Sequence, residues 1–182
     1  MLNRIYALPL PLTAFGMLFL AAAWAWLARC YAARPAAVQR GWRIGNGVLA
    51  ALSLGAVLYA TLLDRGGETV GFMLRPFQLL RDAAAEPELY RSLLMNVLLF
   101  EPLGLTLAQA LPPHRTAMQR AALTVLAAML LSAVIEAAQY AFGLGRAETD
   151  DVLCNTLGAL LGALALPLGG ALGSKNGENS RI

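Results

Sequence analysis

Carboxylate and amide side chains stand inside otherwise apolar stretches of this sequence, where they are candidates for ligand binding or acid–base chemistry. Glu136 and Gln139 are three residues apart, so they share one face if their segment is helical. Asp151 and Asn155 are four residues apart and share a face in the same way. Such groups form hydrogen bonds, and carboxylates can also move protons or bind magnesium. Polar residues in apolar segments are costly, so we treat them as functional candidates.

Three more residues extend this set. Asn96 lies in an earlier apolar stretch, and Asp150 adds a second carboxylate beside Asp151. Arg146 is the only cation in the short connection between the two pairs. We therefore expect Arg146 to pair with Glu136 or Asp151, because a charge near a membrane interior needs a partner.

Glu101 is a separate candidate, because it lies in the middle of an apolar stretch beside Pro102. The proline removes one backbone hydrogen bond from a helix. A carboxylate at this depth is expected to be protonated or to face a wet cavity. We therefore keep Glu101 as a possible site residue.

The stretches that hold these residues predict a membrane protein. The chain has 182 residues, of which 58% are hydrophobic and 14% charged, whereas a soluble globule has about 45–50% and about 25%. About 20 apolar residues span a bilayer as a helix, which satisfies its own backbone hydrogen bonds. A soluble bundle is a poor alternative, because these stretches lack polar faces. The sequence predicts an all-α bundle with five transmembrane helices, at about 5–28, 44–63, 92–111, 121–142 and 152–172.

Small residues predict where helices approach one another closely. Gly158 and Gly162 are four residues apart, and Gly47, Ala51 and Gly55 repeat the same spacing. Each set forms one stripe on a helix, against which a neighbouring backbone can pack. We interpret both stripes as packing surfaces and not as chemistry.

Loop charges predict the orientation of the bundle. Segment 29–43 holds four Arg and no acid, segment 112–120 holds two Arg and one His, and the tail from residue 174 holds one Lys and one Arg. Two predicted helices separate each of these segments from the next, so all three can lie on the same side of the membrane, which the positive-inside rule assigns to the cytoplasm. Segments 64–91 and 143–151 mix Arg with acids and are expected outside. We therefore predict an N-terminus outside and a C-terminus in the cytoplasm.

This topology brings the polar residues to one depth. Asn96 and Asn155 lie about one turn inside the outer ends of their helices, and Glu136 lies about two turns before its exit. At about 1.5 Å per residue these depths agree within roughly 5 Å. The resulting layer either joins helices through an ion pair and amide hydrogen bonds, or also forms a ligand pocket. Two acids and two amides exceed what one helix contact needs, which favours the pocket.

Several classes of protein are not indicated. The sequence has no phosphate-binding glycine loop, no nucleophile elbow and no His-rich metal set. We therefore expect no metal and no cofactor. The net charge is +3, and the arginines cluster in particular loops. This distribution indicates membrane topology and not nucleic-acid binding.

The motifs together resemble the VanZ-like family of small bacterial membrane proteins, over about residues 59–166. Arg75-Pro76-Phe77 is similar to the family's Pro-Phe element in the outer loop, and Glu101 departs from the pattern, which has an apolar residue there. The resemblance rests on Asn96-Val-Leu-Leu-Phe-Glu-Pro-Leu-Gly104, Ser132-x-x-x-Glu136-x-x-Gln139, and Arg146 followed by Asp150, Asp151 and Asn155-Thr-Leu-Gly158-x-x-x-Gly162.

The resemblance implies a link to low-level resistance to the glycopeptide antibiotic teicoplanin, which is the founding member's phenotype. It implies no molecular activity, because none is established for the family. We expect one transmembrane domain at 1–173 in the bacterial cytoplasmic membrane, followed by a disordered polar tail at 174–182.

Three functions stay open. The first is a non-enzymatic protein that binds a lipid or amphipathic ligand at the outer leaflet, such as a lipid-linked cell-wall precursor or an amphipathic antibiotic. Arg146 and Arg75 would then meet an anionic head group. The second is an enzyme acting on a lipid-linked phosphate or glycan through Glu136, Asp150 and Asp151, which the missing nucleophile disfavours. The third is a structural bundle without a ligand.

Overall fold

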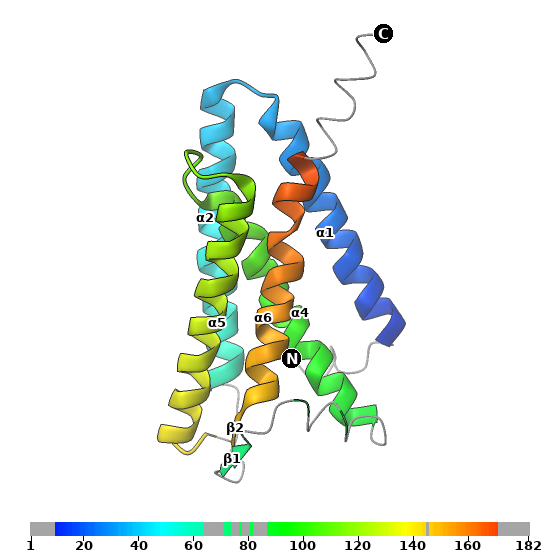
Figure 1. The fold of residues 1–182 in the computed structure, drawn as a ribbon, viewed down its shortest axis with the longest axis vertical. Helices are drawn as coiled ribbons and strands as arrows, with labels where there is room; N and C mark the ends of the chain where they lie inside the picture. Colours follow the sequence, from blue (N-terminus) through cyan, green and yellow to red (C-terminus); the bar gives the residue numbers. More distant parts are fainter. Residues whose placement is uncertain are drawn as a thin grey trace.

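The computed structural model describes residues 10–63, 71–73, 77, 81, 87–144 and 146–170. Over these residues the chain forms long helices and one pair of short strands (Figure 1). In chain order the elements are α1 (Leu10–Ala32), α2 (Ala36–Leu58), the π-helical turn η2 (Tyr59–Leu63), β1 (Gly71–Met73), α4 (Pro87–Ala110), α5 (Ala117–Ala141), β2 (Arg146–Glu148) and α6 (Thr149–Ala163).

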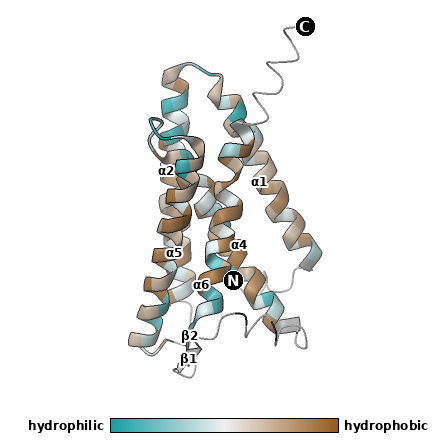
Figure 2. Ribbon diagram, viewed as in Figure 1, coloured by the Kyte–Doolittle hydropathy of each residue, from teal (hydrophilic) through white to brown (hydrophobic). Residues whose placement is uncertain are grey.

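In the part of the chain that the structure describes, five helical segments are long and apolar enough to cross a membrane, so the predicted all-α membrane bundle is confirmed. Large apolar side chains such as Phe19, Leu52 and Val134 are exposed on the outside of these helices. Such an apolar exterior is suited to the lipid environment of a membrane. Figure 2 shows apolar residues along most of the helices, with hydrophilic residues near the start of α2 and the start of α6.

α2 begins earlier than the sequence predicted. The apolar run gave a start near residue 44, whereas the helix starts at Ala36 and includes Arg40 and Arg43. Arginine is a good helix former, and its long side chain can carry the charge out of an apolar layer. The connection between α1 and α2 is therefore only a turn at residues 33–35.

α4 is the central helix, and it contacts α1, α2, α5 and α6. α6 runs in the same direction as α4 and packs tightly against it (Figure 1). A Cβ added at Gly158 would overlap the carbonyl group of Val97, and a Cβ at Gly104 or Gly162 would likewise overlap the facing backbone. Gly158 and Gly162 thus act in helix packing, as the sequence predicted.

The second predicted packing stripe, on α2, is wrong. A Cβ added at Gly55 would meet nothing within 4 Å, and one at Gly47 would meet only the Ala110 Cβ at 3.9 Å. Ala51 and Gly55 are exposed, so from Ala51 onward this face of α2 points away from the other described helices. Small residues permit a close approach, but they do not specify which face a neighbour takes.

The apolar core lies where α2, α4, α5 and α6 meet. Val57, Phe100, Leu103, Ile135 and Ala159 are buried there in one cluster. This core fixes the positions of the helices whose polar residues are described below.

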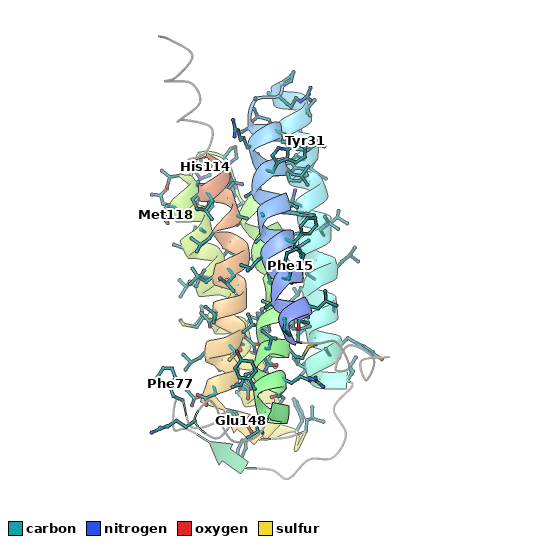
Figure 3. The ribbon with its side chains drawn as sticks, turned by 90° about the vertical axis from the view of Figure 1, so that its right-hand side faces the viewer. Phe15, Tyr31, Phe77, His114, Met118 and Glu148 are labelled. Carbon is teal, nitrogen blue, oxygen red and sulfur yellow. The ribbon has the colours of Figure 1, made fainter. Side chains whose placement is uncertain are left out.

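The two ends of the bundle differ in character. The strand end holds β1, β2 and the start of α6, and the arginine end holds the turn at residues 33–35 and the segment 111–116 (Figure 1). Figure 3 shows Phe77 and Glu148 at the strand end, and Tyr31 and His114 at the arginine end. Residues 1–9 and the predicted tail lie outside the described residues. The side of the membrane that each end faces stays a prediction.

Candidate functional site

The first contact in the polar layer joins α4 to α6. The Asn96 side-chain amide donates a hydrogen bond from Nδ2 to Asp151 Oδ1, at 2.6 Å. Asp151 is buried, with 6% of its surface exposed. A carboxylate is costly to bury without partners, so this bond contributes to holding the start of α6 against α4.

Glu136 forms the second contact, between α5 and β2. Its Oε2 accepts a hydrogen bond from the backbone N–H of Glu148, at 2.9 Å. The carboxylate thereby holds the strand that leads into α6. The predicted pairing of Arg146 with Glu136 or Asp151 involves a side chain outside the described part of the chain, so it stays a prediction.

Gln139 forms the third contact, between α5 and η2, which follows α2 directly. Its Nε2 donates to the Thr61 carbonyl at 2.9 Å, and Gln139 is fully buried. Carbonyl groups in the last turn of a helix lack intrahelical partners. Gln139 satisfies one such carbonyl in the π-helical turn η2.

Asn155 forms the fourth contact, between α6 and α5. Its Nδ2 donates to Ser132 Oγ at 2.8 Å. The other amide atom, Oδ1, is buried and has no hydrogen-bond partner among the described residues. Ser132 lies four residues before Glu136 in the sequence, and it is a site residue that the sequence prediction did not include.

Asp150 contacts the segment between α2 and α4. Its Oδ1 accepts a hydrogen bond from the backbone N–H of Phe77, at 2.6 Å. Phe77 has a φ of 62°, a left-handed conformation that is unfavourable for a residue with a side chain. Asp150 and Asp151 also lie in the first turn of α6, where the helix dipole favours negative charge.

The two short strands bring the same segment onto the α5–α6 connection. They pair in parallel, with Gly71 opposite Arg146 and Met73 opposite Glu148. The sequence did not predict this pair, because three-residue strands carry little pattern. The pairing of the strands places β1 beside β2, whose Glu148 donates its backbone N–H to Glu136.

Glu101 does not join these contacts, and Arg75 lies outside the described residues. Glu101 is deeper in α4, near Gly162, and is 1% exposed. Its Oε2 has no hydrogen-bond partner among the described residues. Glu101 therefore stands apart from the layer formed by Asn96, Asp151 and their neighbours.

A cavity of about 450 Å³ lies beside the layer, between α1, α4 and α6. Its walls are largely apolar, with Met17, Leu93 and Leu157 among the lining residues. Among the described residues that line it, Asp150 is the only charged one, and Phe77 also lines the cavity. Ligand pockets typically measure about 300–1,000 Å³, with apolar walls and a few polar groups.

The carboxylates of the layer do not gather at one point. Among the described residues, no group of three or more His, Cys, Asp or Glu could hold a metal ion. Glu136, Asp150 and Asp151 each accept a hydrogen bond from a different partner. What the described geometry offers is an apolar cavity with one carboxylate, next to a hydrogen-bonded layer.

These features define a polytopic helical membrane protein with a polar layer at one end of its bundle. A family model described as VanZ/LLP1 matches residues 49–170, and the chain belongs to this family. The match contains every motif on which the sequence resemblance rested. No curated protein and no solved structure matches the chain significantly.

Proposed function

We propose that this protein binds an amphipathic molecule, with an apolar chain in the strand-end cavity and a polar head group beside Asp150. The cavity is the observation that carries the proposal, because its walls are largely apolar and the one charged residue of its described lining, Asp150, belongs to the polar layer. An amphipathic molecule has the same division into apolar and polar parts.

The hydrogen bonds of the polar layer indicate which of its residues could contact a bound head group. Asn96, Glu136 and Gln139 bond to other parts of the chain, so helix packing accounts for much of the polarity that suggested a pocket. Asp150 differs because it also lines the cavity. Its carboxylate suits a head group that carries amine, amide or hydroxyl donors.

The membrane side and the physiological role are part of the proposal. The positive-inside rule supports an arginine end in the cytoplasm of a bacterial cell, so the cavity would open near the outer leaflet. A lipid, a lipid-linked cell-wall precursor or an acylated glycopeptide such as teicoplanin would reach it there. Binding such a molecule would connect the protein to cell-envelope or glycopeptide tolerance.

The test is photo-crosslinking in proteoliposomes with a phospholipid that carries a diazirine in its acyl chain. We expect adducts to concentrate on α1, α4 and α6 residues that line the cavity. Leu157→Trp should fill the cavity and remove these adducts. Leu130→Trp is the matched control, because Leu130 is exposed on α5 and does not line the cavity.

Two outcomes would count against the proposal. Adducts spread evenly over all outward faces would indicate ordinary lipid contact. Equal loss of adducts in Leu157→Trp and Leu130→Trp would indicate a general effect of tryptophan. Either result would favour a structural bundle without a ligand.

A further inference from the structure

A second cavity, of about 490 Å³, lies at the arginine end between the start of α2 and the end of α4. Gln39, Arg40 and Arg43 line it from α2, and Ala110 and Pro113 line it from the opposite side. The two charged residues of its described lining, Arg40 and Arg43, are both positive. The cavity therefore favours an anionic occupant.

The charge of Arg43 is not balanced within the described chain. Its Nε is buried and has no hydrogen-bond partner there. The described acids lie elsewhere, with Glu101 midway along α4 and the others at the strand end. A buried guanidinium donor without a partner points to an acceptor supplied from outside.

Arg120 shows what a purely structural arginine does at the same end. Its Nε donates to the Ala108 carbonyl at 3.0 Å, and its Nη2 donates to the Gln109 carbonyl at 2.7 Å. These bonds satisfy carbonyl groups in the last turn of α4. Arg43 Nε has no such role, so helix capping does not explain its position.

The surroundings of the cavity match the depth of lipid head groups. Trp42 lies between Tyr31 and Trp24, with ring centroids 4.3 Å and 6.0 Å apart respectively. Aromatic side chains of this kind concentrate at membrane–water interfaces. These rings therefore place the arginine end of α2 at the interface and not in bulk water.

An apolar path leads from the cavity along the outside of α2. Ile44 lines the cavity and is exposed, and Val48 and Leu52 are exposed at the next two four-residue steps. Residues at this spacing form one stripe on a helix. A head group in the cavity would thus continue into an acyl chain on this stripe.

We propose that the arginine-end cavity binds the phosphate of an anionic phospholipid through Arg40 and Arg43, with an acyl chain along Ile44, Val48 and Leu52. Arginine forms charge-assisted hydrogen bonds with phosphate oxygens, and its planar group can donate two in parallel. Basic cavities between membrane helices are suited to anionic head groups. This site is separate from the strand-end cavity and does not depend on the function proposed for it.

The experiment uses the full chain in detergent micelles, with phosphatidylglycerol, phosphatidylcholine or inorganic phosphate added at matched concentrations. Retained lipid is measured by native mass spectrometry, and the unfolding temperature is measured in parallel. We expect phosphatidylglycerol to be retained and to raise the unfolding temperature more than phosphatidylcholine. Arg40→Gln/Arg43→Gln should weaken retention by roughly fivefold for each arginine.

The matched control is Arg34→Gln/Arg115→Gln. It removes the same charge at the same end, but both residues are exposed and neither lines this cavity. It should retain phosphatidylglycerol nearly as the unmodified chain does. A second variant, Arg40→Lys/Arg43→Lys, covers the case in which Arg40→Gln/Arg43→Gln fails to fold. It keeps the positive charge and should preserve most of the retention of phosphatidylglycerol.

Three results would overturn the proposal. The first is equal retention of phosphatidylglycerol and phosphatidylcholine. The second is equal weakening in the site variants and in the control variant. The third is a full stabilising effect from inorganic phosphate alone, which would assign the cavity to a free anion and not to a lipid.

Discussion

Asn96 and Asp151 are 55 positions apart in the sequence, yet the Asn96 amide donates to the Asp151 carboxylate at 2.6 Å. The bond joins α4 to α6, two helices that run in the same direction with α5 between them in the chain. It lies near the close approach of Gly158 to Val97. Tight backbone packing and a buried hydrogen bond therefore act together at this contact.

The first prediction concerns that backbone contact. Gly158→Ala should lower the free energy of unfolding by about 1–3 kcal/mol, because its Cβ would overlap the Val97 carbonyl. Thermal unfolding in detergent measures the change. Gly55→Ala is the control, since a Cβ there meets nothing within 4 Å. Equal effects of the two substitutions would contradict the packing described here.

The second prediction concerns the hydrogen bond itself. A double-mutant cycle of Asn96→Ala and Asp151→Ala should give a coupling energy of about 0.6 kcal/mol and at most about 1.7 kcal/mol, the average and the maximum measured for hydrogen bonds between membrane helices. A cycle of Asn96→Ala with Gln139→Ala should give about zero, within roughly 0.5 kcal/mol, because Gln139 bonds to η2 instead. Similar coupling in both cycles would mean that the bond is not specific.

The third prediction concerns orientation. Reporters inserted in the turn at residues 33–35 and after Pro113 should read as cytoplasmic, and a reporter after Gly143 should read as external. The first two sites share the arginine end, so they must give the same answer in this fold. An external signal from the turn at 33–35 would reverse the orientation and move the strand-end cavity to the inner leaflet.

The sequence predicted the helices well because long apolar runs have few alternatives in a membrane. Five alternating spans fix which helix ends meet, so the sequence could bring the start of α4, the end of α5 and the start of α6 to one end of the bundle. It missed the start of α2, since charged residues looked like a loop although Arg40 and Arg43 are compatible with a helix. Apolar runs locate a span better than they locate its ends.

The partners of the site residues were harder to predict. Glu136, Gln139 and Asp150 bond to backbone groups of Glu148, Thr61 and Phe77, respectively. Every residue has such groups, so no residue type signals them. The cavity depends on how side chains of three helices pack together, which spacing along one helix does not show.

The last prediction separates a ligand site from a helix contact within the same layer. Asp150→Asn should leave the fold intact, because an amide oxygen can still accept the Phe77 N–H, but it removes the charge that lines the cavity. Glu136→Gln removes a charge from the same layer at a residue that does not line the cavity, and its amide oxygen can still accept the Glu148 N–H.

The readout is tolerance of teicoplanin, in a strain where deleting the gene lowers tolerance, with protein abundance measured alongside. We expect Asp150→Asn and the cavity-filling Leu157→Trp to lower tolerance at normal abundance, and Glu136→Gln to retain it. Full tolerance in well-expressed Asp150→Asn and Leu157→Trp would rule out the cavity as the functional site. Loss in Glu136→Gln alone would move the functional charge from the cavity to the α5–β2 contact.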